Sequence, residues 1–360
     1  MLYRPNDVVC GRYEIESFIG EGGMQEVYRA NDRILSRQVA LKTPKNRSAE
    51  KRFHRSAVVS AKVNHANVAK TLDYLEDGSR QFLVEELILG QDLGVILKES
   101  IVALDPLMAA RVFHRLARGV AASHHAEVVH RDLKPSNIMG VNGIKLDDVK
   151  ITDFGIAKMA EEELEEAVLG GQSTLTASQT AIGALPYMAP EMITSVKDAD
   201  KPVDIWSLGA LMFELATGKR PFGVGYAAVP AILEGTLPPL PSLVTRNNQF
   251  KQTATEIYEI IKGCIRIDPG DRPTADQLVK QCETLCYPNT AREIGMISRF
   301  DNGRWGFVSP ENGNTVFFHI NSIFGNRRVS VGDRVTFARH LGGGSDRAFP
   351  MVKIVPSSRR

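Results

Sequence analysis

The spacing of hydrophobic and polar positions changes twice along this chain. Up to about residue 93, short runs with strand-like alternation (RYEIESFIG, EVYRA, QVALK and FLVEEL) surround one helical stretch at residues 49–64. From residue 105 onward a helical period dominates. Its apolar positions recur every four residues at Met108, Val112, Leu116 and Val120, and residues 205–215 form a long apolar helix. These patterns predict a small sheet with one helix, followed by a mostly helical part.

The helical pattern ends near residues 288–292. The remainder alternates strand-like runs (MISRF, WGFVS, TVFFHI, RVTFA and PMVKIV) with turns rich in Gly and Asn. A small all-β domain is therefore expected at this end, and the chain as a whole falls in the α+β class.

Composition adds information mainly through the distribution of charge. At roughly 150 residues per domain, 360 residues predict about two domains, and 43% hydrophobic with 24% charged residues is typical of a globular protein. The net charge is only +2, yet residues 291–360 hold 11 Lys and Arg against 5 Asp and Glu, which leaves residues 1–290 net negative. The basic charge is concentrated in the all-β domain.

The cysteines and the apolar segments indicate in which cellular compartment the protein is expected. Cys10, Cys264, Cys282 and Cys286 form no CxxC pair and have no histidine at metal-ligand spacing, so we expect no zinc site and a reducing compartment. The first residues lack a signal-peptide pattern, and no stretch of about 18 apolar residues could cross a bilayer. The expected location is the cytoplasm, with no membrane partner.

Five short motifs follow one another in a fixed order. The first, GEGG at residues 20–23, is a glycine turn between two predicted strands, where backbone N–H groups can approach phosphates closely. Taken alone, a plain hairpin explains this turn better. The turn is followed, however, by VALK at 39–42, HRDLKPSN at 130–137, DFG at 153–155 and APE at 189–191. Five matches in this order do not arise by chance.

This set resembles the eukaryotic-like (Hanks-type) Ser/Thr protein kinases, which implies a bilobal kinase fold with a small β-rich lobe and a helical lobe. The resemblance also implies ATP and Mg²⁺ as cofactors and a protein as substrate. By this resemblance Asp132 accepts the proton of the substrate hydroxyl, and Lys134 neutralises the transferring group. Lys42 holds the α- and β-phosphates, while Asn137 and Asp153 hold Mg²⁺.

The resemblance further implies an adenine pocket and two structural residues. The pocket is expected to use the loop glycines Gly20 and Gly22, the side chains of Ile19, Val27, Ala40 and Met139, and the backbone of Glu86 and Ile88. Any one of these residues alone is equally explained as an ordinary core or strand residue. Arg272 is expected to pair with Glu191, and Asp204 to support the catalytic loop.

Three departures from the family pattern motivate an alternative. Gln25 replaces the third loop glycine, Ser56 stands where a helix glutamate should pair with Lys42, and Ala184 replaces a threonine before the APE motif. The alternative function is a pseudokinase, a nucleotide-binding scaffold that acts through its C-terminal domain. The retained Lys42 and the retained acids favour the enzyme.

The missing helix glutamate leads to a specific hypothesis. Aligning FLVEELI at residues 82–88 with the family hinge places Glu85 at the back of the adenine pocket, close to the strand that carries Lys42. A buried carboxylate needs a partner, so Glu85 is predicted to replace the absent glutamate. In the equally weighted alternative, Glu85 bonds a backbone amide or water and Lys42 is not held.

The segment from residue 153 to residue 191 is long and rich in hydroxyl groups. The expected phosphorylation sites are Ser173, Thr174, Thr176, Ser178 and Thr180, and Arg131 is expected to receive such a phosphate. A polar loop without phosphate explains these residues equally well. Autophosphorylation would also agree with a homodimer.

The C-terminal runs resemble a cold-shock domain, a five-stranded OB-type barrel. In that family, aromatic side chains on neighbouring strands stack on bases, and the matching positions here are Trp305, Phe307, Phe317 and His319. Single-stranded RNA or DNA is the expected partner. The alternative, aromatics that only fill a barrel core, fits the basic charge less well. The expected domains are residues 1–12, an N-terminal extension; 13–287, the kinase domain; and 288–360, the cold-shock-like domain.

Overall fold

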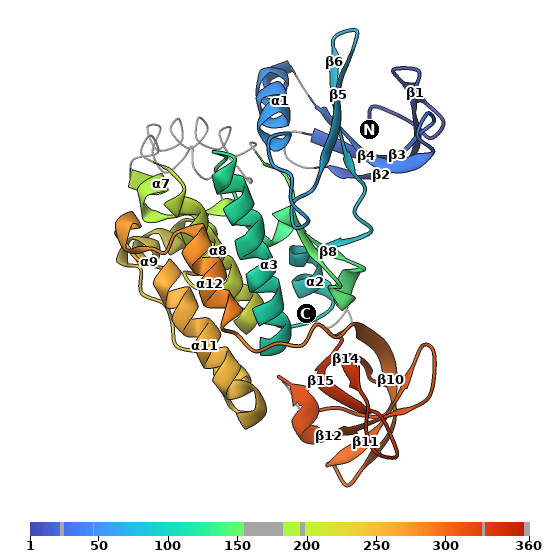
Figure 1. The fold of residues 1–360 in the computed structure, drawn as a ribbon, viewed down its shortest axis with the longest axis vertical. Helices are drawn as coiled ribbons and strands as arrows, with labels where there is room; N and C mark the ends of the chain where they lie inside the picture. The colour runs from blue at the N-terminus through green and yellow to red at the C-terminus, as the bar shows by residue number, and fades with distance from the viewer. Residues whose placement is uncertain (22–24, 46, 155–182, 195–198, 326–327, 356–360) are drawn as a thin grey trace.

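The computed structural model describes residues 1–360 except 22–24, 46, 155–182, 195–198, 326–327 and 356–360. The described chain forms a β-rich N-terminal lobe, a helical lobe and a C-terminal barrel, which follow one another along the long axis of the molecule (Figure 1). This arrangement confirms the predicted α+β fold with a bilobal first part. None of the helices in the described part of the chain has the length and apolar character that a bilayer crossing requires.

The N-terminal lobe is an antiparallel sheet in the order β1-β2-β3-β4-β6-β5 with one helix against it. Its strands are β1 (Val8–Val9), β2 (Tyr13–Glu21), β3 (Gln25–Asp32), β4 (Arg37–Pro44), β5 (Thr71–Asp77) and β6 (Arg80–Glu86), and its helix is α1 (Arg47–Ser60). Strand alternation gives the sheet two apolar faces. Tyr28, Leu41 and Val84 are buried on one face, while Phe53 of α1 packs on Leu83 on the other.

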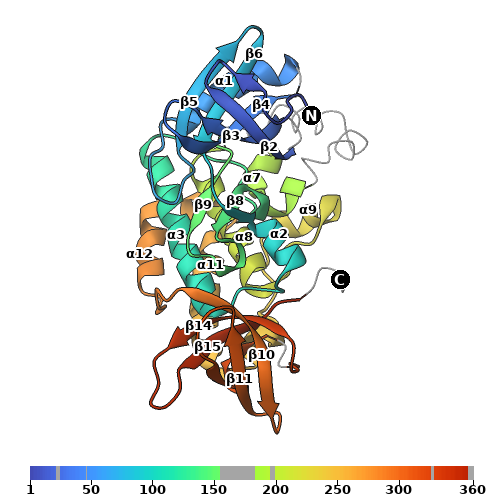
Figure 2. The ribbon, with the colours of Figure 1, turned by 90° about the vertical axis from the view of Figure 1, so that its right-hand side faces the viewer.

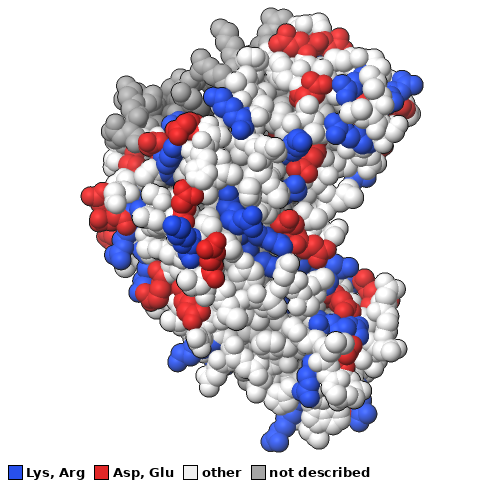
Figure 3. All heavy atoms as spheres, in the orientation of Figure 1, with Lys and Arg blue, Asp and Glu red and all other residues white. Residues whose placement is uncertain are grey.

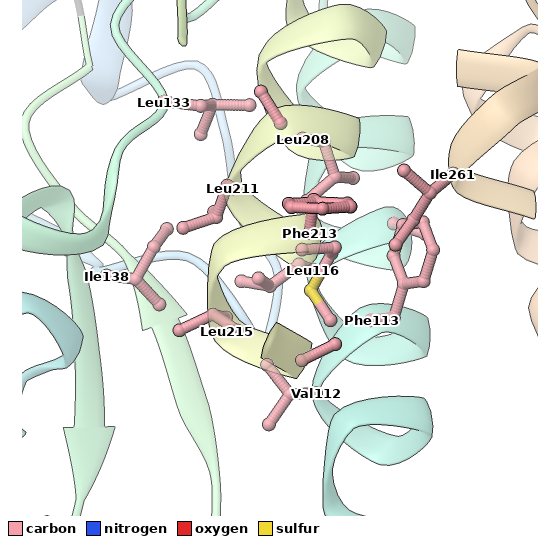
Figure 4. Close-up of a cluster of buried hydrophobic side chains, with 14 of the residues drawn as sticks. Val112, Phe113, Leu116, Leu133, Ile138, Leu208, Leu211, Phe213, Leu215 and Ile261 are labelled. Atoms are coloured by element: carbon pink, nitrogen blue, oxygen red, sulfur yellow. The ribbon is translucent and has the colours of Figure 1, made fainter. Parts of the chain in front are cut away.

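The helical lobe is built around α3 and α8. Its helices are α2 (Leu93–Glu99), α3 (Pro106–His125), α7 (Pro190–Thr194), α8 (Pro202–Thr217), α9 (Val229–Glu234), α10 (Ser242–Thr245), α11 (Asn248–Cys264) and α12 (Ala275–Glu283), and its small sheet is β7 (Gly90–Asp92), β8 (Ile138–Val141) and β9 (Val149–Ile151). Helix α8 is apolar nearly all round and therefore lies in the interior. Figure 4 shows Leu211 and Leu215 of α8 directed toward Ile138 of β8, in one buried cluster with Val112 and Leu116 of α3.

The C-terminal domain is a closed barrel. Its strands are β10 (Arg292–Asp301), β11 (Trp305–Pro310), β12 (Val316–His319), β13 (Ile323–Phe324), β14 (Arg334–His340) and β15 (Arg347–Lys353). The order β12-β11-β10-β14-β15 closes on itself through a β12–β15 pairing, and the two-residue β13 pairs with β15. The predicted five-stranded barrel is confirmed, with β13 as a short addition.

The barrel docks on the helical lobe through its own interface. Phe250 of α11 stacks on Phe349 with ring centroids 5.5 Å apart and meets Phe324 edge-on at 5.5 Å. A buried ion pair joins Arg292 of β10 to Asp105, whose side chain also caps α3. Both views show β14 and β15 on the side of the barrel toward the lobe (Figures 1 and 2). The barrel is thus packed against the helical lobe and shares apolar contacts with it.

Candidate active site

Lys42 and Glu85 lie on the same face of the N-terminal sheet. The register of β4 against β6 pairs Ala40 with Glu85 and Lys42 with Leu83, so the lysine and the glutamate are diagonal neighbours. The Lys42 Nζ atom is 2.7 Å from a Glu85 carboxylate oxygen and 2.8 Å from Asp153 Oδ1. The predicted Glu85–Lys42 contact is confirmed.

Burial and ion pairing act in opposite directions on the charged groups of this cluster. Burial favours a lower pKa for Lys42, but the carboxylates of Asp153 and Glu85 outweigh it and raise that pKa above its ordinary value. The pKa of Glu85 is raised above its ordinary value by burial, although the Lys42 ammonium acts to lower it. For Asp153, Lys42 and a hydrogen bond from Gln25 outweigh burial, and the pKa is lowered. Lys42 is therefore a charged bridge between the two carboxylates.

Helix α1 is linked to the loop after β9 by two hydroxyl groups. Ser56 donates a hydrogen bond of 2.6 Å to the Phe154 carbonyl, and Ser60 donates a second one of 3.2 Å. The hydroxyl that replaces the expected glutamate therefore bonds to the backbone of the DFG motif. The contribution of Ser60 had no signal in the sequence, because it depends on where the distant residue 154 lies.

Gln25 does more than replace a glycine. Gln25 is 8% exposed, and its side-chain amide donates a 3.0 Å hydrogen bond to Asp153 Oδ1. The sequence indicated only a stiffer loop at this position. In the structure the first residue of β3 reaches across to an acid of the other lobe.

The loop of the HRDLKPSN motif brings three polar side chains together. Lys134 Nζ lies 2.9 Å and 2.7 Å from the two carboxylate oxygens of Asp132, and the Asn137 amide donates to the Asp132 carbonyl (2.7 Å) and carboxylate (2.9 Å). Ala184, where a threonine hydroxyl was expected, is buried against Leu185 and Met188. The Asp132 carboxylate is therefore held by Lys134 and Asn137.

Asp204 of α8 holds the start of this loop through hydrogen bonds to its backbone. The buried carboxylate accepts hydrogen bonds from the backbone N–H groups of His130 (2.8 Å) and Arg131 (2.7 Å), and it lies 2.9 Å from His124 Nε2. The left-handed backbone at Arg131, φ 65°, is held by these bonds. Glu191 forms a two-pronged pair with Arg272 at 2.6 Å and 2.8 Å. Both predicted structural contacts are confirmed.

Two side-chain oxygen atoms, one from Asn137 and one from Asp153, are of the kind that binds a hard divalent cation. Because the Asn137 nitrogen is already bonded to Asp132, its side-chain oxygen is the atom left to face a ligand. Asp153 accepts hydrogen bonds from Lys42 and Gln25 at Oδ1, while the Thr152 hydroxyl lies 3.4 Å from its Oδ2. An amide oxygen and a carboxylate oxygen are donors that Mg²⁺ accepts. Among the described residues no cluster of three His, Cys, Asp or Glu side chains is present.

The residues expected around adenine come from both lobes. Val27 pairs with Lys42 across β3 and β4, so Val27, Ala40 and Lys42 share the sheet face described above. Ile19 and Gly20 belong to β2, Met139 to β8, and Ile88 to the connection after β6. The Glu86 side chain binds Lys150 at 2.8 Å. Gly22 lies outside the described residues.

The expected phosphorylation sites also lie outside the described part of the chain. They are Ser173, Thr174, Thr176, Ser178 and Thr180. Their expected partner Arg131 is described, and its guanidinium donates to the Ala199 carbonyl at 2.9 Å.

The barrel carries a second candidate site on β11 and β12. The register pairs Trp305 with His319 and Phe307 with Phe317, so all four side chains lie on one face. Trp305, Phe307 and Phe317 contact one another with ring centroids 5.8 to 6.3 Å apart. The alternating residues form the core, among them the buried Val308, Val316 and Phe318. The four predicted residues therefore lie outside the barrel core.

Cations accompany these rings. The guanidinium of Arg299 lies 5.4 Å from the centre of the Trp305 ring, and that of Arg347 lies 5.6 Å from the Phe317 ring. Figure 3 shows Lys and Arg gathered at the end of the barrel farthest from the helical lobe. Arg347 had no signal in the sequence, since only the closing β12–β15 pairing brings it to Phe317.

Comparisons with known proteins identify both domains. The model of the protein kinase domain matches residues 13–282, and that of the "cold-shock" DNA-binding domain matches residues 293–354. The chain is 36% identical over 224 residues to the probable serine/threonine-protein kinase PknB of Corynebacterium glutamicum, covering 60% of this chain and 33% of that protein. It is 32% identical over 285 residues to the serine/threonine-protein kinase PrkC of Bacillus subtilis, covering 77% and 41%. For PknA of Mycobacterium tuberculosis the identity is 34% over 253 residues, covering 67% and 55%. The chain thus spans about a third to a half of these relatives.

Proposed function

This chain belongs to the protein kinase family and carries a cold-shock domain after the kinase domain, and from this premise we propose that it transfers the γ-phosphoryl group of ATP to serine or threonine hydroxyls of a protein. The observation that carries the proposal is the cluster of Asp132, Lys134 and Asn137, joined by hydrogen bonds of 2.7 to 2.9 Å. In this proposal Asp132 is the base, Lys134 is the cation, and Asn137 supplies an oxygen to the metal.

Each residue of the cluster has a distinct role in this proposal. Asp132 accepts the proton of the attacking hydroxyl, and Lys134 beside it neutralises charge on the transferring group. Lys42 binds the α- and β-phosphates from the side of the N-terminal lobe. Asn137 and Asp153 would hold Mg²⁺, which when bound neutralises phosphate charge.

Adenine is proposed to bind between the lobes. The residues proposed for this pocket are Ile19, Gly20, Gly22, Val27, Ala40, Glu86, Ile88 and Met139. The shared sheet face of Val27 and Ala40 with Lys42 supports this position, because base and phosphates must bind the same side of the sheet.

The barrel is proposed to bind single-stranded RNA or DNA. Trp305, Phe307 and Phe317 offer ring faces on which bases can stack, and the arginines beside them offer charge for the phosphates. Autophosphorylation between two copies within residues 173–180 is also proposed. The cysteine pattern supports a reducing compartment such as the cytoplasm.

The alternative function, a pseudokinase scaffold, is less well supported. The relatives are named as kinases, and a scaffold does not require Asp132, Lys134 and Asn137 in one hydrogen-bonded cluster. A transfer assay separates the two functions. The full chain should incorporate phosphate from radiolabelled ATP with Mg²⁺, and Asp132→Asn should abolish incorporation. Glu234→Gln, which changes an exposed glutamate of α9, is the matched control. Equal incorporation by the wild type and Asp132→Asn would refute the proposal.

A further inference from the structure

We infer that Glu85 is the positioning residue of Lys42, so that the lysine is aligned by the sheet itself and independently of helix α1. The pairing of Glu85 with Lys42 is observed directly. The consequence for phosphate transfer rests on the proposed function, and the experiments below separate the two.

The placement of the pair makes it rigid. Glu85 and Lys42 belong to adjacent strands of one hydrogen-bonded sheet, as diagonal neighbours in a continuous register from Val39 to Lys42. Glu85 is 4% exposed and Lys42 is 6% exposed, so neither side chain can exchange its partner for bulk water. A contact between neighbouring strands does not require two separate elements to dock. The lysine is therefore aligned as soon as the sheet forms.

The charges facing Glu85 support the same assignment. Lys42 is the cation at ion-pair distance, 2.7 Å, while Asp153 and Glu86 are the acids that act on Glu85. Without Lys42, Glu85 would be a buried carboxylate repelled by its neighbours. Lys42 in turn contacts Asp153 at 2.8 Å, so the lysine connects Glu85 of β6 to an acid of the helical lobe.

Helix α1 is attached elsewhere. Ser56 and Ser60 of this helix bond to the Phe154 carbonyl, at 2.6 Å and 3.2 Å. The helix therefore contacts the backbone of the DFG motif, while Glu85 contacts the lysine. A shift of α1 would change the first contact and leave the second in place.

The decisive variants remove the charge or supply it from the helix. Glu85→Gln keeps the shape and removes the charge. Glu85→Met removes both, and Glu85→Met with Ser56→Glu offers a carboxylate from α1. Glu76→Gln, an exposed glutamate on the neighbouring strand β5, is the matched control. For each full-length variant, kcat and KM for ATP are measured with casein as acceptor, the affinity for ADP without Mg²⁺ by calorimetry, and thermal unfolding by circular dichroism.

We expect Glu85→Gln and Glu85→Met to lower kcat/KM about 100-fold, because a displaced catalytic group costs a factor of this order. Adding Ser56→Glu to Glu85→Met should raise kcat/KM again by about tenfold. A purely structural role of Glu85 would not produce this coupling between the two positions. Ser56→Glu alone should bring no gain. The inference is overturned if both Glu85 variants retain the kcat, KM and ADP affinity of Glu76→Gln.

Two further readouts keep the inference separate from the proposed function. If the wild type shows no Asp132-dependent transfer, the proposed function fails, but the ADP affinity still tests the role of Glu85. About tenfold weaker ADP binding by Glu85→Gln supports the inference. Unchanged ADP binding overturns it. If Glu85→Met is poorly folded, the Lys42→Met/Glu85→Met double variant should unfold at a higher temperature than either single variant. Additive losses would contradict the pairing.

Discussion

Gln25 gives a prediction about nucleotide binding. Its amide donates to Oδ1 of Asp153, the acid proposed to hold Mg²⁺, and so competes with the metal for the negative charge of that carboxylate. Removing the side chain should therefore favour binding. Net hydrogen bonds to charged groups contribute about 1.5–3 kcal/mol, and part of this is regained when water replaces the amide. We expect Gln25→Ala to bind ADP with Mg²⁺ roughly fivefold more tightly, as measured by calorimetry. Equal or weaker binding would show that Gln25 does not compete with nucleotide.

Asp204 gives a prediction about stability and pH. Burial tends to raise the pKa of this carboxyl, but hydrogen bonds from His124 and from backbone N–H groups outweigh it and lower the pKa below its ordinary value of 3.8. A lowered folded-state pKa adds stability above pH 3.8, and this stability is lost as the pH falls through the folded-state value. Asp204→Asn should lose about 3 kcal/mol at pH 7 in urea unfolding. Its stability should also fall less between pH 4 and pH 2 than that of the wild type, and parallel curves would contradict the assignment.

The sequence could predict single residues only where a motif or an alignment positioned them. Glu85 was predicted to contact Lys42 because the hinge alignment placed it on the strand next to β4. The bond from Gln25 to Asp153 was not predicted, since these residues are 128 positions apart and the direction of a side chain at the end of a strand is set by tertiary packing.

Helix α1 and its two hydroxyl groups give a prediction for a secondary-structure element. Ser56 and Ser60 share one acceptor, so the loss of one hydroxyl leaves the other in place. The double change Ser56→Ala/Ser60→Ala leaves the Phe154 carbonyl buried without these donors and should cost about 1–3 kcal/mol. Hydrogen exchange of the α1 amides should accelerate in the double variant. Unchanged exchange would show that Phe53 and its apolar neighbours alone hold the helix.

The stacking face of the barrel is an element that strand periodicity predicts well. Alternation along β11 and β12 fixes which side chains share a face, so Trp305, Phe307 and Phe317 could be grouped from the sequence. Arg347 could not be assigned to Phe317 from the sequence, because barrel closure decides which strand lies beside β12. Phe307→Ala and Phe317→Ala should each weaken binding of a single-stranded oligonucleotide by about 1–3 kcal/mol. Equal affinity of the double variant and the wild type, with the barrel folded, would exclude stacking.

For the molecule as a whole, the docked barrel is the feature that the sequence did not predict. The apolar period of α11 marks Phe250 as buried, but it does not show that the rings covering it, Phe324 and Phe349, come from another domain. A domain order can be derived from motifs, whereas an interface depends on the shapes of two finished surfaces.

The two sets of aromatic residues should therefore have separable effects. Phe250→Ala removes the stacked contact at the interface and should release the barrel, which would increase the radius of gyration in X-ray scattering and leave oligonucleotide affinity unchanged. Phe307→Ala should weaken oligonucleotide binding and leave the radius of gyration unchanged, because its ring lies on the stacking face. Loss of oligonucleotide affinity in Phe250→Ala, or an unchanged radius of gyration, would contradict this separation.

The central claim is that the Asp132 cluster transfers phosphate to serine and threonine. The most direct test is a mass-spectrometric map of the full chain after incubation with ATP and Mg²⁺, recorded for the wild type and for Asp132→Asn after phosphatase treatment of both. The account predicts phosphoserine or phosphothreonine in the wild type and none in Asp132→Asn. The same phosphorylated residues in both proteins, or none in either, would contradict it.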